Sequence, residues 1–126
     1  HGHLVGDEVL VAVVQTCVQH VRAGDCFGRL GGEEFALVLP DTQLPQACDL
    51  AERLRSATAA LAIPLPGETI RPTISVGLAM AADDDTTLSD LLRRADAAMY
   101  EAKAGGRNRV VCARPTGGAQ AEPVPA

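Results

Sequence analysis

The chain has 126 residues and a formal net charge of −5, which is long enough for one small domain with a hydrophobic core but too short for two. Apolar residues make up 47% of the sequence and aromatic residues only 2%, which predicts a globular core built from Ala, Val and Leu. The acidic balance argues against binding to a nucleic-acid backbone, and no apolar run reaches the roughly 18 residues that predict a transmembrane helix.

The predicted elements alternate between helices and strands. Apolar periodicity predicts helices over 8–21, 44–62 and 88–104, with Pro40, Asp41 and Thr42 capping the second and Thr86 or Thr87 the third. Apolar or alternating runs predict strands over 26–30, 35–39, 73–80 and 109–112. We expect a turn-rich connector at 63–68, a solvated acidic loop at 83–85, and a disordered tail over 113–126 because Pro, Gly and Ala dominate there.

The four cysteines are Cys17, Cys26, Cys48 and Cys112, and none is spaced as Cys-x-x-Cys. They are expected to be reduced, small apolar residues of a cytosolic protein, and they argue against a zinc site.

The most informative stretch is the Gly31-Gly32 pair between two predicted strands. Two glycines that tolerate positive φ favour a β-hairpin, and a turn without side chains lets a flat ligand approach the backbone. Glu33 and Glu34 follow at once. Carboxylates crowded at a turn suit Mg²⁺ beside a phosphate-bearing substrate, although a solvated acidic hairpin is the ordinary alternative. If both residues belong to a strand, they point to opposite faces.

The string from Gly31 to Phe35, Gly-Gly-Glu-Glu-Phe, resembles the signature of the GGDEF-domain diguanylate cyclases, in the variant with Glu at the third position. Gly2-His3, Gly6-Asp7 and Leu10 resemble the family's Gly-His-x-x-Gly-Asp-x-x-Leu segment. The stretch from Ala95 to Asn108 resembles its Ala-Asp-x-Ala-x-Tyr-x-Ala-Lys-x-x-Gly-Arg-Asn segment. The resemblance covers residues 1–112, with the motifs in the family's order and spacing.

The resemblance implies roles for individual residues of the substrate site. Glu33 would bind the metal and act as a base, and Glu34 would be a second carboxylate near it. Gly31 and Gly32 would give access to the backbone, and Asp7 would accept hydrogen bonds from guanine. Asp7 can also be explained as a carboxylate favoured near a helix N-terminus.

The basic pair at the end of the last helix has two explanations. In the family, Lys103 and Arg107 hold the triphosphate, and a Lys and an Arg that converge on phosphate are chemically suited to this. Basic groups near a helix C-terminus also stabilise the helix dipole.

Arg22 and Asp25 form an Arg-x-x-Asp pair that resembles the family's inhibitory site for cyclic di-GMP. Ala51-Glu52-Arg53 resembles the Ala-Glu-Arg from which some members add Arg53 to that site. An exposed loop ion pair and a solvated helix arginine are the ordinary explanations.

The fold implied is α+β, with a ferredoxin-like or nucleotidyl-cyclase-like, antiparallel-rich sheet covered by helices. In the family a first strand, which carries a metal-binding Asp and is followed by a guanine-binding Asn, precedes the region matched here. We therefore expect residues 1–112 to be a partial GGDEF domain that lacks its central strand, poorly stable and inactive as a fragment.

The implied function is the condensation of two GTP molecules into cyclic di-GMP with release of two pyrophosphates, inhibited by its product. Mg²⁺ or Mn²⁺ would be the cofactor, a homodimer the catalytic unit, and an upstream sensor domain the regulator of a cytoplasmic or membrane-anchored protein. The alternatives are a noncatalytic cyclic di-GMP receptor and a dimerisation module without ligand.

Overall fold

The computed structural model describes residues 3–82, 85–113 and 121–123 of the chain. In these ranges the elements are, in chain order, α1 (His3–Val18), β1 (Cys26–Gly31), β2 (Glu34–Val38), α2 (Leu44–Ala59), β3 (Ile63–Leu65), β4 (Glu68–Ile70), β5 (Val76–Leu78), α3 (Leu88–Ala104), β6 (Val110–Ala113) and β7 (Ala121–Pro123). The predicted α+β class is confirmed.

The described strands form three small sheets. β1 and β2 pair as an antiparallel hairpin, and so do β3 and β4. β6 lies between β5 and β7 in the third sheet, parallel to β5 and antiparallel to β7. Because β5 and β6 run in parallel, they need a crossover connection, and α3 provides it.

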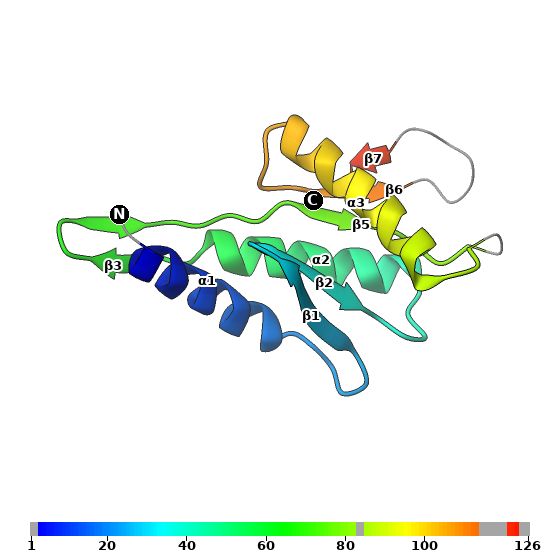
Figure 1. Cartoon of the computed structure of the whole chain (residues 1–126), viewed down its shortest axis with the longest axis horizontal. Coiled ribbons are helices and arrows are strands. Elements are labelled where there is room, and N and C mark those ends of the chain that lie inside the picture. The colour runs from blue at the N-terminus through cyan, green and yellow to red at the C-terminus, as the bar shows by residue number, and fades with distance from the viewer. Residues whose placement is uncertain (1–2, 83–84, 114–120, 124–126) are drawn as a thin grey trace.

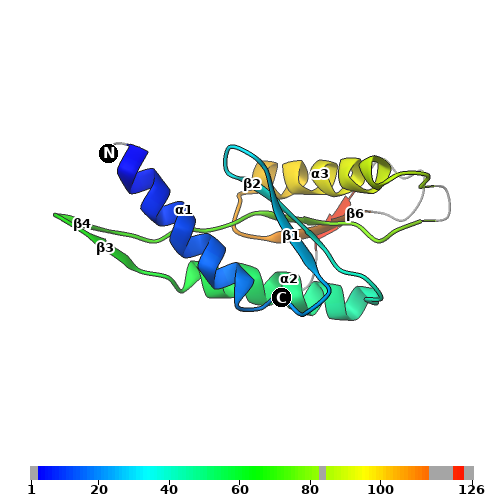
Figure 2. The ribbon, with the colours of Figure 1, turned by 60° about the horizontal axis from the view of Figure 1, so that its bottom comes forward.

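Helices cover both sides of the β5 and β6 strands. Both α2 and α3 contact these strands, and they lie on opposite sides of them (Figures 1 and 2). α1 packs beside α2, and the β3–β4 hairpin projects at one end of the molecule (Figure 2). The β1–β2 hairpin crosses the molecule with its turn beside α3, the helix whose last turn carries Lys103 (Figure 2).

Small side chains allow the helices to approach the sheets closely. One buried cluster joins Cys17 of α1 to Leu50 and Leu54 of α2, and a second joins Ala98 and Ala102 of α3 to Val111 of β6. A side chain at Gly77 of β5 would overlap the backbone of α3 at Ala95 and Met99. Gly77 thus lies on the face of β5 on which α3 packs.

The helices differ from their predicted bounds at three ends. α1 begins at His3 instead of residue 8 and ends at Val18 instead of residue 21, so Asp7 lies within the helix, and the first turn contains no acidic residue. α2 begins at Leu44 as predicted and ends at Ala59 instead of residue 62. Its N-cap is Gln43 instead of residues 40–42, and the Gln43 backbone N–H donates to the Gln46 side chain at 3.0 Å. Thr87 caps α3 as predicted, because its hydroxyl accepts from the Asp90 N–H at 3.2 Å.

The connector predicted at 63–68 is wrong in part, since residues 63–70 contain β3 and β4 joined at Gly67, which has φ 82°. β5 is shorter than predicted. Asp85 is not merely solvated, because its carboxylate pairs with Arg94 at 2.5 Å, whereas residues 83–84 lie outside the described ranges.

The predicted disordered tail differs at both described positions, because Ala113 belongs to β6 and residues 121–123 form β7. Residues 114–120 and 124–126 lie outside the described ranges.

Candidate functional site

The acidic turn is held by its own backbone and by one arginine. Gly31 pairs with Glu34 after an irregularity in the register, so the turn residues are Gly32 and Glu33, one position later than the glycine pair predicts. Gly32 has φ 51°, a conformation that costs other residues strain. The Arg29 Nε donates to the Gly32 carbonyl oxygen at 2.7 Å, and the Arg29 Nη2 donates to the same oxygen.

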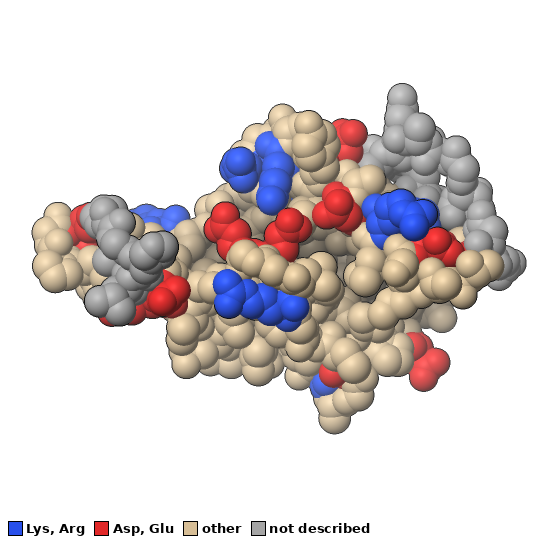
Figure 3. Space-filling model, viewed as in Figure 1, with Lys and Arg blue, Asp and Glu red and all other residues tan. Residues whose placement is uncertain are grey.

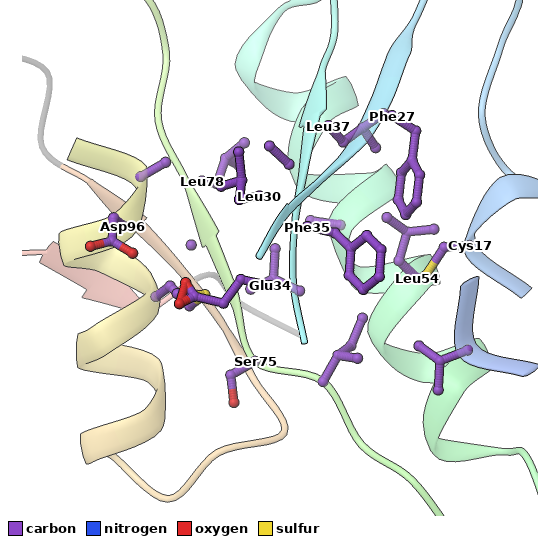
Figure 4. Close-up of a pocket in the computed structure, with 18 of the residues that line it drawn as sticks. Cys17, Phe27, Leu30, Glu34, Phe35, Leu37, Leu54, Ser75, Leu78 and Asp96 are labelled. Carbon is purple, nitrogen blue, oxygen red and sulfur yellow. The ribbon is translucent and has the colours of Figure 1, made fainter. Parts of the chain in front are cut away.

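A cavity of about 330 Å³ lies between this hairpin, β5, α2 and α3. Apolar side chains of α1, α2 and the hairpin line one end of it, including Cys17, Leu54 and Phe35 (Figure 4). At the other end, Glu34 extends from β2 toward α3, which carries Asp96 (Figure 4). The volume lies at the lower end of the range for small-molecule sites, and the mixed lining suits a ligand with one flat and one charged part.

Charged residues of both signs line this cavity. Glu33 and Glu34 line the cavity together with Lys103 and Arg107. Because Glu33 belongs to the turn instead of the strand, the alternation expected for two successive strand residues does not separate it from Glu34. Figure 3 shows acidic side chains across the middle of one face, with basic side chains on either side of them.

Sequence reasoning missed Asp96 as a lining residue. It stands seven positions before Lys103, which is two helical turns, so both residues lie on the same side of α3. This spacing was the signal that could have found it.

Three of the predicted substrate residues do not line the cavity. Gly31 and Gly32 lie at the exposed hairpin tip, beside Glu33. Asp7 is exposed on α1. The structure therefore brings together the two glutamates and the two basic residues, and the assignment of Asp7 to guanine, made from the sequence, remains a prediction.

Arg22 and Asp25 form a closed pair in the loop before β1. The Asp25 carboxylate accepts from the Arg22 backbone N–H at 2.9 Å and from the Arg22 Nε at 3.3 Å. Hydrogen bonding by Arg22 holds the pKa of Asp25 below its usual value. The Arg22 Nη2 also donates to the Thr42 hydroxyl at 2.6 Å, whereas Arg53 is exposed on α2 and makes no ion pair with any described residue.

Within the described ranges, no group of three or more His, Cys, Asp or Glu side chains is arranged to hold a metal ion. None of the helices described combines the length and hydropathy needed to cross a bilayer. Cys17, Cys26 and Cys48 are free thiols, as predicted.

Known proteins are similar to this chain in sequence and in fold. The sequence model "Diguanylate cyclase, GGDEF domain" matches residues 1–109. Diguanylate cyclase DgcM of Escherichia coli is 44% identical over 114 residues, which are 90% of this chain and 27% of DgcM. Response regulator PleD of Caulobacter vibrioides is 42% identical over 112 residues, which are 87% of this chain and 25% of PleD. The chain thus spans about a quarter of the length of these relatives.

Solved structures agree with the sequence matches. Diguanylate cyclase SiaD of Pseudomonas aeruginosa, solved with its activator SiaC, is 40% identical, with a TM-score of 0.83 over 89% of this chain and 43% of SiaD. These likenesses confirm the predicted nucleotidyl-cyclase-like fold. The chain belongs to the GGDEF-domain family of diguanylate cyclases.

Proposed function

We propose that the domain to which this chain belongs condenses two GTP molecules into cyclic di-GMP and releases two pyrophosphates. The observation that carries the proposal is the cavity with Glu33 and Glu34 on the hairpin side and Lys103 and Arg107 on the α3 side. This arrangement suits a nucleoside triphosphate, whose phosphates need cations and whose metal needs carboxylates. The curated relative DgcM is named a diguanylate cyclase.

The carboxylates fit Mg²⁺, or Mn²⁺ in its place. Among the described residues, no third acidic, His or Cys side chain is arranged with the two glutamates to hold a metal ion, so the protein alone makes an incomplete cage. Mg²⁺ is bound in this way, by one or two carboxylates with substrate phosphates and water. Glu33 and Glu34 would hold the ion, which supplies positive charge against the phosphates.

Different residues bind different parts of the GTP substrate. Lys103 and Arg107 bind the phosphates and orient the triphosphate along α3. Gly31 and Gly32 leave the hairpin tip free of side chains, so a nucleoside can lie against it. Asp7 accepts hydrogen bonds from the N1–H and amino group of guanine where the base extends beyond the cavity.

Catalysis requires two copies of the domain, arranged head to tail with one GTP in each. The 3′-oxygen of each GTP forms a bond to the α-phosphorus of the opposing GTP, and the bond from that phosphorus to the pyrophosphate oxygen breaks. Glu33 takes the proton of the 3′-hydroxyl. After both transfers the ring is closed and two pyrophosphates leave.

We propose further that Arg22 and Asp25, with Arg53, bind the product and inhibit the enzyme. Support comes from the preformed Arg22–Asp25 pair, in which the Asp25 side chain is 2% exposed and the Arg22 side chain is 55% exposed. The guanidinium of Arg22, although held by Asp25, keeps N–H donors free for a phosphate. The GGDEF domain of DgcB from Caulobacter crescentus, 30% identical with a TM-score of 0.83 over 88% of this chain and 66% of that chain, was solved in complex with c-di-GMP.

The same pair supports a second candidate function, that of a noncatalytic cyclic di-GMP receptor. Such a receptor has no need of the Glu33–Glu34 pair, which is why the cyclase is preferred. A dimerisation module without ligand has no need of Lys103 and Arg107 in the cavity. In any of these roles we propose a cytoplasmic domain controlled by a sensor elsewhere in a longer protein.

The 126-residue chain alone is proposed to have low activity. β2 and β5 line the same cavity, yet no strand pairing joins them within the described residues. Their free edges leave the two walls without a rigid connection, so the acidic and basic sides of the site are not held at a fixed separation.

The deciding experiment incubates the domain, extended by a strand that fills this gap, with GTP and Mg²⁺ and separates the products by chromatography. We expect cyclic di-GMP from the parent and a loss of at least about a hundredfold in rate for Glu33→Gln, because the variant has neither the charge nor the base. Glu101→Gln, an exposed change on α3 outside the cavity, is the matched control. No product but saturable binding of cyclic di-GMP would favour the receptor, and neither would favour the dimerisation module.

A further inference from the structure

The loop that carries Arg107 has an unfavourable backbone. Arg107 has φ 65° and the next residue, Asn108, has φ 48°. Both are non-glycine residues in the left-handed region, where Cβ crowds the following carbonyl oxygen. Two such residues in succession persist only where the surrounding structure fixes them.

Contacts within the loop account for part of this. The Arg107 N–H donates to the Ala102 carbonyl oxygen at 2.9 Å, which continues the end of α3. The Arg109 Nε donates to the Arg107 carbonyl oxygen at 3.0 Å, and its guanidinium occupies the space beside Gly105 and Gly106. These contacts leave the Asn108 side chain to be held from elsewhere.

That side chain is held by a different helix. The Arg55 Nη1 of α2 donates to the Asn108 Oδ1 at 2.9 Å, across 53 positions of sequence. Because α2 and α3 lie on opposite sides of the sheet, this bond ties the loop after α3 to the far layer of the molecule (Figure 2).

Arg55 is itself fixed before it reaches the loop. Its Nε donates to both Glu52 carboxylate oxygens at 2.9 and 3.0 Å, and its Nη2 donates to Oε1 at 2.5 Å. The side chains of Arg55 and Glu52 are 21% and 27% exposed, so water competes with this pair only in part. The planar guanidinium therefore has one orientation, in which Nη1 points to Asn108.

We infer that Arg55 is a positioning residue for Arg107. By holding Asn108, it keeps residues 107 and 108 in their left-handed conformation, and this conformation is what directs the Arg107 side chain to the cavity. The role of Arg107 toward phosphate rests on the proposed function, but the control of its loop by Arg55 does not.

The test compares Arg55→Met with the parent in the full 126-residue chain. Methionine keeps the unbranched stem and removes every donor. The backbone HN–Hα couplings and Cα shifts of residues 107 and 108, measured by NMR, report φ directly. We expect both residues to leave the left-handed region in Arg55→Met, and GTP with Mg²⁺ to bind about tenfold more weakly by calorimetry.

Arg93→Met is the matched control, because Arg93 is 76% exposed on α3 and its pair with Asp90 is long, at 3.6 Å. It should change neither readout. Asn108→Ala removes the acceptor while leaving the Glu52–Arg55 pair intact, so it decides the matter if Arg55→Met does not fold. The double variant with Arg55→Met and Asn108→Ala should show little more effect than either single variant, since both changes remove the same Arg55–Asn108 hydrogen bond.

Unchanged couplings at residues 107 and 108 in Arg55→Met, or in Asn108→Ala, would overturn the inference whatever happens to GTP. A parent chain that binds no GTP would count against the proposed function. The HN–Hα couplings of residues 107 and 108 would still test the role of Arg55.

Discussion

At the scale of single residues, the acidic turn depends on a backbone conformation as much as on its carboxylates. Gly32 takes φ 51°, and the Arg29 guanidinium holds its carbonyl oxygen. A ligand that approaches the turn therefore meets a fixed backbone. This fixed backbone carries the acidic side chains of Glu33 and Glu34.

Gly32→Ala tests how much this backbone conformation matters. No heavy atom lies within 4 Å of a Cβ added at Gly32, so any loss of stability in the variant reflects the φ angle alone. We expect a loss of about 1 kcal/mol in the free energy of unfolding, measured with urea. Gly28→Ala is the control, since Gly28 also has open space but no positive φ, and it should be neutral or slightly stabilising. Equal effects would contradict the argument.

At the scale of elements, sequence patterns predicted what local chemistry dictates. The β1–β2 hairpin and all three helices were found because apolar periodicity and turn residues mark them. The β3–β4 hairpin was missed because its strands have only three residues each and Pro64 and Pro66 suggest a loop. The early start of α1 was missed because Gly6 interrupts the pattern there.

The candidate site, too, was predictable only in part. Motif residues such as Glu33 and Lys103 were identified from the sequence motifs that contain them, but that they line one cavity depends on the tertiary structure. Asp96 was missed because an exposed helix carboxylate is ordinary until packing places it beside a cavity. Nor could the sequence show that a residue of α2, Arg55, reaches the loop of Arg107.

The gap between β2 and β5 gives a prediction at this scale. A chain extended by one apolar strand that pairs with both free edges should melt at a higher temperature than the 126-residue chain, because backbone groups and apolar walls on both sides gain partners. Circular dichroism on heating measures this. An extension of equal length and scrambled apolar pattern is the control, and equal melting temperatures for all three would contradict the idea.

At the scale of the whole molecule, ion pairs on several elements make the fold sensitive to acid. Arg22 holds the pKa of Asp25 below its usual value, Arg55 does so for Glu52, and Arg94 does so for Asp85. Hydrogen bonds from Thr86 lower the pKa of Asp90 at the start of α3. These groups join loops, α2 and α3 to their neighbours.

Because each pKa is lower in the folded chain than in the unfolded one, the stability that these groups contribute is present above the ordinary carboxyl range, near pH 4, and is lost as the pH falls through the folded values. We therefore expect the melting temperature to fall between about pH 5 and about pH 3. Arg94→Met should make this fall shallower, since Asp85 then loses its main partner. A melting temperature independent of pH over this range would contradict the prediction.

The scarcity of aromatic side chains has a practical consequence for following these changes. Phe27 and Phe35 stack across the hairpin with ring centroids 5.5 Å apart, and the sequence has no tryptophan and one tyrosine. That tyrosine, Tyr100, is 71% exposed, so its emission in the native chain is already close to that of a hydrated phenol. Intrinsic ultraviolet fluorescence should thus change little when the chain unfolds. A tryptophan in place of Phe27 would supply a fluorescent reporter beside the cavity.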